Sequence, residues 1–356
     1  PPPCVQAEDG IRDALVGLVG SEMCIRDRMC SMNIAETRIP QDGRLSLQVQ
    51  GHRVDYRVSA QPTTHGENIV LRVLDRAKGI VPIDQLGIHE ETLNELKMMM
   101  ARPEGIILVT GPTGSGKTTT LYSLLNYVKS EQVNIMTLED PVEYPMDMIR
   151  QTSVNEVARM GFANGIRSMM RQDPDIILVG EIRDEDTADM AFRAAMTGHQ
   201  VLSTLHTNSA IGTFPRLLDI GVLPDIMTGN IIGVISQRLI RLLCDQCKVE
   251  KEPDEIESKL LDIEVDSKKH KIYDAKGCIH CDNTGYKGRV AIIEALRINT
   301  ELDEKIAKRA TLGELKSTAK TTGYITLADD AVRCVLEGKT SLTEVSRVID
   351  LTQRLM

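Results

Sequence analysis

The chain has 356 residues, a formal net charge of −9 and few aromatic residues, with no Trp and only three Phe. Its length predicts two or three domains, and its acidic balance argues against broad nucleic-acid binding, which usually leaves a basic surface. No run approaches the roughly eighteen apolar residues of a membrane-spanning helix, so any membrane association is expected to pass through a partner.

The first 28 residues look foreign to the rest of the chain. They begin without Met, and Glu8, Asp9 and Asp13 interrupt the apolar stretch that a signal peptide needs. The strings AEDGIRD and LVGSEMCIRD resemble translated adapter DNA from short-read sequencing, and the alternative is a short, unusual N-terminal helix. We therefore expect residues 1–28 to be a non-native segment.

Residues 29–77 are predicted to form part of a small, β-rich N-terminal domain whose sheet lacks its beginning. A turn is expected at Pro40–Arg44, before the alternating sequence LSLQVQ. Further strands are predicted at Val54–Ala60 and Ile69–Asp75, since apolar and polar residues alternate there. Residues 78–89 are predicted to be a linker.

From residue 90 the pattern changes to that of an α/β domain. A helix is predicted at Glu90–Ala101, and the apolar run GIILVT at Gly105–Thr110 is typical of a strand buried in a parallel sheet. A second helix is predicted at Lys117–Lys129. Strands alternating with helices indicate a doubly wound sheet, which we assign to residues 90–243. The remaining strands are predicted at 134–140, 175–181 and 200–207.

The segment GPTGSGKT fits the phosphate-loop pattern GxxxxGK[ST] and lies between a predicted strand and a predicted helix. Glycines let backbone N–H groups surround a phosphate, and the helix dipole favours its negative charge. Lys117 is expected to reach the β- and γ-phosphates of ATP, and the Thr118 hydroxyl to bind Mg²⁺. The predicted nucleotide-binding residues are Gly111, Pro112, Thr113, Gly114, Ser115, Gly116, Lys117, Thr118 and Thr119.

Two strand ends offer candidate catalytic carboxylates. The predicted strand DIILVGE ends on Glu181, and the predicted strand NIMTLED ends on Glu139 and Asp140. The alternative to a catalytic role is that these carboxylates are only solvated groups at strand ends. Which carboxylate polarises the attacking water stays open. His199 and His206 lie seven residues apart in TGHQVLSTLHT, and residue chemistry allows either hydrogen-bonded core residues or catalytic groups.

Two CxxC pairs, Cys244 with Cys247 and Cys278 with Cys281, can supply four thiolates to a Zn²⁺ ion. A closed site of four cysteines leaves no position for water, so its role would be structural. The 30 residues between the pairs exceed the usual zinc-ribbon gap. The alternative is therefore a set of reduced thiols at the base of a loop.

The cysteine pairs also divide the C-terminal part of the chain. A tetracysteine metal-binding module is predicted at residues 244–296, with the charged stretch between the pairs forming an exposed excursion. Residues 297–356 have a helical pattern, with turns expected at Gly323 and Gly338.

Several segments, in one order along the chain, resemble the secretion ATPase superfamily: TLEDPVEY, Met169–Ala210, Pro215–Val222, Gly233–Cys247 and Gly277–Leu296. Residues 31–350 are similar to the cytoplasmic ATPases of type II secretion and type IV pilus assembly. The resemblance implies an α/β, RecA-like P-loop ATPase domain, with a small N-terminal α+β sheet domain and a tetracysteine zinc module. It also implies ATP, Mg²⁺ and Zn²⁺ as cofactors.

The same resemblance implies partners and a location. The ATPase would be a cytoplasmic homohexamer, held at the inner membrane through platform and recruitment proteins, with no direct nucleic-acid contact. The family's N-terminal recruitment region is expected to be absent from this chain.

The resemblance also implies roles for single residues. Glu181 matches the Walker B carboxylate, and His199 and His206 match a histidine box that senses the γ-phosphate. Arg57 and Arg72, with Arg44 a weaker match, correspond to arginines that act across a subunit boundary; ordinary strand-face cations are the alternative. The aspartate box matches Glu139, Asp140 and Glu143. The implied catalytic residues are Lys117, Glu139, Glu181, His199, His206, Arg57 and Arg72.

The tetracysteine pairs favour one branch of this family, because secretion and assembly ATPases carry them whereas pilus retraction ATPases lack them. Three other functions stay open: a pilus retraction ATPase, an ATP-binding scaffold with little turnover, and a nucleic-acid translocase. The intact phosphate loop and carboxylates argue against the scaffold, and the acidic balance argues against the translocase.

Overall fold

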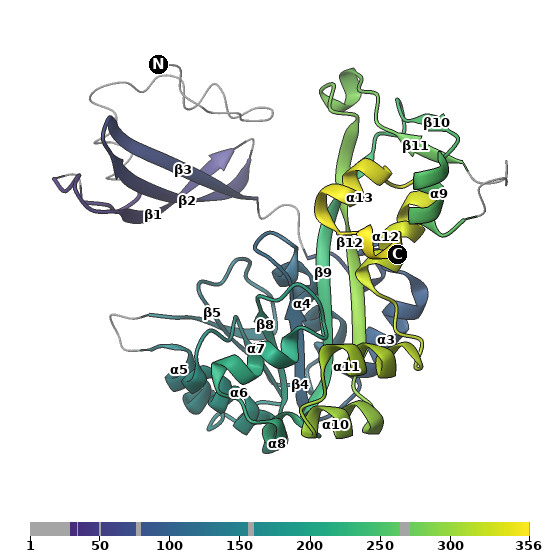
Figure 1. Ribbon diagram of the computed structural model, residues 1–356. Coiled ribbons are helices and arrows are strands. Elements are labelled where there is room, and N and C mark those ends of the chain that lie inside the picture. Colours follow the sequence, from purple (N-terminus) through teal and green to yellow (C-terminus); the bar gives the residue numbers. More distant parts are fainter. Residues whose placement is uncertain are drawn as a thin grey trace. The chain divides into compact units, whose positions relative to one another are not determined.

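The computed structural model describes residues 29–33, 35–49, 51–75, 80–155, 160–263 and 271–355. The chain divides into two compact units, whose boundary along the sequence falls between Gly79 and Ile80, and each contains its own sheet (Figure 1). Residues 1–28, expected to be a non-native segment, lie outside the described residues. Within the described residues, no helix combines the length and apolar character needed to cross a bilayer.

The N-terminal unit contains a three-stranded antiparallel sheet. Its strands, in spatial order, are β1 (Gln41–Val49), β2 (His52–Thr63) and β3 (Gly66–Asp75). One face is apolar, because alternate residues of β2 point into a small core that also includes Cys30 and Met32.

The turn predicted at Pro40–Arg44 is wrong, because β1 begins at Gln41 and runs through this segment. Gly43 does not reverse the chain direction. It lets the strand pack closely against Cys30, because a Cβ at this position would lie 2.6 Å from the carbonyl oxygen of Cys30. The strand reverses later, around Gly51, whose φ of 83° favours glycine.

The second unit is built on a seven-stranded sheet with the order β12-β9-β4-β8-β7-β5-β6. All neighbouring pairs are parallel except β12 and β9, which are antiparallel. The predicted α/β fold with a central parallel sheet is therefore confirmed. The strands are β4 (Gly105–Thr110), β5 (Ile135–Glu139), β6 (Ile149–Ser153), β7 (Ile176–Val179), β8 (Gln200–Leu205), β9 (Ile231–Leu243) and β12 (Tyr286–Arg297).

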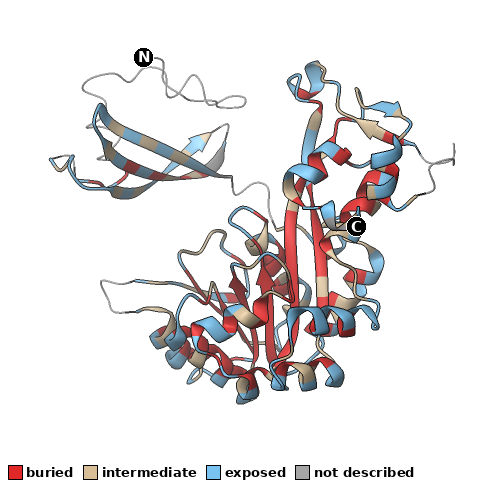
Figure 2. Cartoon of the chain, in the orientation of Figure 1, coloured by how far each residue is buried: buried red, intermediate tan, exposed pale blue. Residues whose placement is uncertain are grey.

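Helices cover both faces of this sheet, and the buried residues concentrate in its strands (Figure 2). In β4, Ile106 and Leu108 contribute to one core cluster, and Ile107 and Val109 to the cluster on the opposite face. Every residue of β4 is buried, as expected for a strand whose apolar and polar residues do not alternate. The first cluster includes α5 (Phe162–Met169), α6 (Glu185–Met196) and α7 (Thr213–Ile220), and the second α3 (Glu90–Met100), α4 (Lys117–Val128) and η2 (Ile83–Gln85).

The C-terminal region is helical, as predicted, and its turns at Gly323 and Gly338 are confirmed by φ values of 80° and 67°. Helices α10 and α11 join the first core cluster, while α12 and α13 pack on the far end of β9 and β12. The helices are α8 (Pro224–Met227), α10 (Thr300–Ala307), α11 (Leu312–Lys320), α12 (Leu327–Leu336), α13 (Leu342–Val348) and η4 (Thr352–Arg354).

The stretch between the two CxxC pairs is only partly the exposed excursion that its charge predicts. It forms β10 (Val249–Lys251), α9 (Glu255–Leu261) and β11 (Ile272–Asp274), and β10 pairs with β11. Leu261 and Ile272 are buried in the core that α12 and α13 share with β9 and β12. These two buried apolar side chains therefore attach a mostly charged segment to that core.

Candidate functional site

The phosphate loop connects the carboxyl end of β4 to the start of α4. Its glycines are required by both conformation and space. Gly116 has a φ of 89°, and a Cβ on Gly111 would lie 2.6 Å from the carbonyl oxygen of Gln237. Because α4 begins at Lys117, its free backbone N–H groups point toward this turn. Loop and helix together form a cradle suited to an anion such as phosphate.

Lys117 folds back over this loop. Its Nζ donates hydrogen bonds to the carbonyl oxygens of Gly111, at 2.9 Å, and Pro112, at 3.1 Å. Burial lowers the pKa of Lys117, and the nearby charge of Arg238 lowers it too, while Glu181 opposes them. The ammonium group therefore lies within electrostatic range of a carboxylate and of a second cation.

Glu181 and His206 come together from neighbouring strands. β7 and β8 are parallel, and both residues follow the carboxyl ends of their strands, at the edge where the phosphate loop follows β4. Glu181 pairs with Arg183, and its Oε2 lies 3.8 Å from Nε2 of His206. The side chain of His206 is half exposed. The structure thus brings a lysine, a carboxylate and an imidazole to one edge of the sheet.

Glu139 ends β5 at this same edge, but it is buried. Its carboxylate accepts hydrogen bonds from Tyr122, from Thr137 at 2.5 Å and from Gln151 at 3.3 Å. Burial raises the pKa of Glu139, although these three hydrogen bonds act in the opposite direction. Asp140, the next residue, is exposed. Glu139 is therefore more enclosed than Asp140, the other carboxylate at the end of this predicted strand.

His199 lies at the other edge of the sheet, away from this subunit's phosphate loop, and this position argues against the γ-phosphate-sensing role that the resemblance implies. It precedes β8, and its carbonyl oxygen accepts a hydrogen bond from Gly105 at the start of β4. Six strand residues, spanning roughly 20 Å, separate this edge from the phosphate loop. The imidazole Nδ1 instead lies 3.0 Å from the carbonyl oxygen of Ala194, in the last turn of α6. A seven-residue spacing along one strand places two histidines at opposite ends.

Arg57 and Arg72 lie in the N-terminal unit, directly opposite each other in β2 and β3. Arg44 in β1 is the partner of Arg57 on its other side. Residues opposite each other in a sheet share a face, so the three arginines form one row across the strands.

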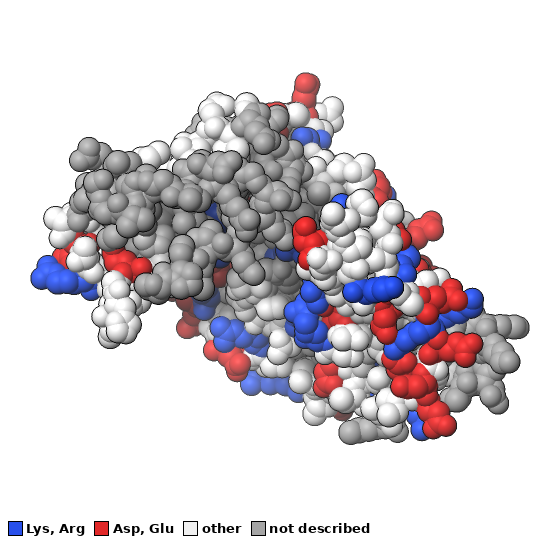
Figure 3. Space-filling view, turned by 90° about the horizontal axis from the view of Figure 1, so that it is seen from above, with Lys and Arg blue, Asp and Glu red and all other residues white. Residues whose placement is uncertain are grey.

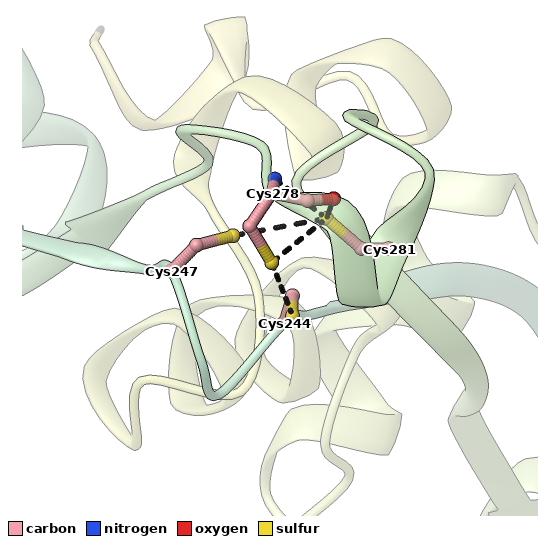
Figure 4. A group of neighbouring side chains, drawn as sticks. All are labelled: Cys244, Cys247, Cys278 and Cys281. Carbon is pink, nitrogen blue, oxygen red and sulfur yellow. Dashed lines mark hydrogen bonds between the residues drawn. The ribbon is translucent and has the colours of Figure 1, made fainter.

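The four predicted zinc ligands converge at the far end of β9 and β12 (Figure 4). All four Sγ atoms lie within 4.8 Å of one another. The Sγ–Sγ distances are 3.8 Å for Cys244 and Cys278, 3.8 Å for Cys247 and Cys281, and 3.7 Å for Cys278 and Cys281. Zn–S bonds of about 2.3 Å in a tetrahedron require edges of about 3.8 Å. The donor set therefore fits zinc.

Backbone geometry also prepares these cysteines for a metal. The N–H groups of Cys278 and Gly285 each donate to Sγ of Cys281, at 3.2 Å. Burial acts to raise the pKa of the Cys281 thiol, but these N–H groups, together with hydrogen bonds to the side chains of Cys278 and Cys247, outweigh it and bring the pKa to about 7. The long gap between the pairs is no obstacle, because Cys244 follows β9 and Cys281 precedes β12. These strands pair as far as Tyr286 and Leu243.

Three side chains near the nucleotide edge escaped the sequence analysis: Gln237, Arg238 and Glu294, which are all buried. Gln237 Nε2 donates to the carbonyl oxygen of Ser115 in the phosphate loop, at 2.6 Å. The sequence signal for two of them is the polar pair Gln237 and Arg238 inside the apolar run GVISQRLI. Polar side chains are costly in a buried strand unless they are hydrogen-bonded.

Comparison with known proteins identifies the family. A family model described as type II/IV secretion system protein matches residues 15–347. The chain belongs to this family. Among curated family members, the chain is 47% identical over 324 residues to the type IV pilus assembly ATPase TfpB of Acinetobacter baylyi. It is 46% identical over 320 residues to type II secretion system protein E of Pseudomonas aeruginosa.

These family members are longer than the chain. Each match covers 90% of the chain but only 55% of TfpB and 63% of the Pseudomonas protein. Among solved structures, the pilus retraction motor PilT with bound ADP matches with a TM-score of 0.63 and 26% identity, covering 94% of the chain and 82% of PilT. A Legionella pneumophila ATPase, DotB, shares the fold with a TM-score of 0.61 at 23% identity.

Proposed function

We propose that this chain is the ATP-hydrolysing part of a hexameric motor that drives pilus or pseudopilus assembly, in type IV pilus biogenesis or type II secretion. The observation that carries the proposal is the meeting of the phosphate loop, Glu181 and His206 at one edge of the sheet. The names of the two curated relatives support the choice of machine.

The roles in hydrolysis follow from this arrangement. The N–H groups of Gly111–Thr119 would hold the phosphates, Lys117 would leave its carbonyl partners for the γ-phosphate, and the Thr118 hydroxyl would bind Mg²⁺. That ion supplies charge neutralisation on the phosphate oxygens. Glu181 would orient the attacking water, with enclosed Glu139 as the other candidate. His206, beside Glu181, would contact the γ-phosphate.

Phosphate release by the purified chain, together with a measurement of ATP binding, tests this proposal. Lys117→Ala should abolish hydrolysis, because no other side chain of the loop carries positive charge. Glu181→Gln should leave ATP bound but unhydrolysed. Lys129→Ala, at the opposite end of α4, is the matched control and should keep normal turnover. ATP binding without turnover by the unaltered chain would favour the scaffold instead.

Assembly or secretion is proposed over retraction because of the cysteine cluster. We propose that Cys244, Cys247, Cys278 and Cys281 hold one structural Zn²⁺ ion that fixes the far ends of β9 and β12. The fitting Sγ–Sγ distances support this role. The likeness to PilT, at lower identity than the two curated relatives, is the observation that keeps retraction as the alternative.

The partners follow from the proposed machine. We propose a cytoplasmic homohexamer held at the inner membrane by platform and recruitment proteins. Direct nucleic-acid binding is not expected, since the chain carries a net charge of −9. Acidic and basic side chains are interspersed over the described part of the face drawn in Figure 3.

A further inference from the structure

Strand β9 continues past the edge of the sheet at which the nucleotide site lies. Its last pair with β4 is Ser236 opposite Thr110, the residue just before the phosphate loop. Gln237 and Arg238 follow and are paired only with β12. These two residues therefore lie beside the phosphate loop. They also lie near the loop 206–210, which follows β8 and carries His206.

Arg238 is bonded to that loop. Its Nη2 donates to the carbonyl oxygen of Asn208, at 3.1 Å, and to the Asn208 side-chain oxygen, at 3.3 Å. Its Nη1 donates to the carbonyl oxygen of Gln237, at 3.0 Å. The phosphate loop is attached to the same point of β9, because the Gln237 side chain donates to Ser115. One short piece of strand thus contacts both catalytic loops.

The charge of Arg238 is unusual for its surroundings. The residue is only 9% exposed, and no ion pair to it occurs in the part of the chain that the structure describes. Arg238 is attracted electrostatically by Glu294 and repelled by Lys117. Burying a cation is costly unless it is hydrogen-bonded, so the bonds to Asn208 and Gln237 are what compensates the buried guanidinium.

Glu294 completes the attachment of the loop from the other side. Its Oε1 accepts a hydrogen bond from the backbone N–H of Ala210, at 2.6 Å, and its Oε2 accepts one from Leu327, at 3.1 Å. The loop 206–210 is therefore held at Asn208 by β9 and at Ala210 by β12. The backbone that carries His206 is therefore held on both sides, by β8 before it and by these hydrogen bonds after it.

We propose that Arg238 is a positioning residue for hydrolysis. Through its hydrogen bonds to Asn208, it holds the loop 206–210 in a fixed position relative to the phosphate loop. Its part in turnover rests on the proposed ATPase function, whereas its hold on the loop does not. Loss of the guanidinium should therefore have two separable consequences, a more mobile loop without nucleotide and slower turnover with it.

Hydrogen exchange of the nucleotide-free chain tests the first consequence. In Arg238→Gln, amides of residues 206–210 should exchange at least about fivefold faster than in the unaltered chain, because the loop opens more often. Arg241→Gln is the matched control. Arg241 lies three residues further along β9 and pairs with Glu344, away from this loop. Unchanged exchange at 206–210 in Arg238→Gln would overturn the proposal, whether or not the chain hydrolyses ATP.

A double-mutant cycle with His206→Ala tests the second consequence. Arg238→Gln alone should lower kcat by at least about tenfold, with a smaller change in KM, since ATP is still bound. In the His206→Ala background the same change should cost less than about twofold, because the loop then has no imidazole to position. An equal loss in both backgrounds would refute positioning. Absence of turnover in the unaltered chain would count against the proposed function, while the exchange result would still decide the role of Arg238.

Discussion

His206 and Glu181 face each other across the ends of two parallel strands, with Nε2 3.8 Å from Oε2. The two strands end at Val179 and Leu205, so both side chains come from the first two residues beyond their strands. Positions just past strand ends are the usual ligand sites of open α/β sheets. Any phosphate held by Lys117 would meet the carboxylate and the imidazole together.

The two histidines give the sharpest test of this geometry. His206→Ala should lower ATP turnover by at least about tenfold, because it removes the imidazole beside Glu181. His199→Ala should stay within about twofold of the unaltered chain, since His199 lies at the opposite edge of the sheet. Steady-state phosphate release measures both, and thermal melting verifies that both variants fold. A large loss from His199→Ala alone would contradict the assignment.

Much of this site could be predicted because its signals are local. The phosphate loop needs glycines at fixed offsets and Lys117 at a helix start, and these needs appear directly in the sequence. The predicted strand at Gly105–Thr110 agrees with β4 residue for residue. The cysteine pairs were equally visible, because a metal site requires particular ligand types.

Other features depend on tertiary structure, which spacing does not reveal. The separation of His199 from the site follows from the direction of β8, and a sequence pattern cannot state which strand end faces the phosphate. The lengths of β9 and β12 were not predicted, because their polar residues interrupt any simple alternation. The burial of Leu261 and Ile272 depends on α12 and α13, which lie many residues later.

Metal content tests the cysteine cluster. Freshly purified, reduced protein should contain one zinc ion per chain, because the four Sγ atoms are spaced as a tetrahedral site requires. Cys278→Ser should lose most of the zinc, whereas Cys334→Ala, which changes a buried cysteine outside the cluster, should keep it. Elemental analysis gives the ratio directly. Zinc-free protein with a normal fold would refute the metal site.

Zinc removal should also act locally. The cluster lies beyond Leu243, at the far end of β9 from the phosphate loop, so chelation should loosen this end first. Hydrogen exchange should rise in residues 244–251 and 278–286 more than in the phosphate loop. Equal or greater exchange in the phosphate loop would contradict a purely local structural role.

Glu344 predicts how stability depends on pH. Its carboxylate accepts hydrogen bonds from Arg347, at 2.7 and 2.9 Å, and from Arg241, at 2.6 and 3.1 Å. Burial acts to raise its pKa, but these hydrogen bonds outweigh it and lower the pKa from 4.5 to about 2. Because the folded state holds the charged form, its stabilisation is present above about pH 4.5 and is lost as pH falls toward 2.

Glu344→Gln should therefore reduce the free energy of unfolding at neutral pH and flatten its decline in acid. Urea midpoints between about pH 6 and pH 3 measure this dependence. Glu131→Gln, in an exposed turn before β5, is the control and should preserve the slope of the unaltered chain. An unchanged slope in Glu344→Gln would mean that the Arg241 and Arg347 pairs do not stabilise the fold through this charge.

The last prediction concerns the arginine row of the N-terminal unit. Charge on the γ-phosphoryl group in the transition state needs a cation beyond Lys117, and an arginine finger typically contributes about 10³- to 10⁵-fold. Arg183 is already paired with Glu181. Arg57 and Arg72 lie on a separate compact unit, which is able to serve a neighbouring subunit's site if it moves as a body. We therefore expect Arg57→Ala and Arg72→Ala to bind ATP normally but to lose most turnover.

Mixing experiments separate action across subunits from action within one. When Arg57→Ala is mixed with Lys117→Ala, some interfaces combine an intact phosphate loop from the first variant with an intact arginine from the second. Such mixtures should recover part of the activity that neither variant has alone. Mixing Lys117→Ala with Glu181→Gln should recover far less, because both changes affect the same subunit's site. If subunits exchange yet the first mixture stays inactive, the arginines do not act in trans, and their row is an ordinary cationic strand face.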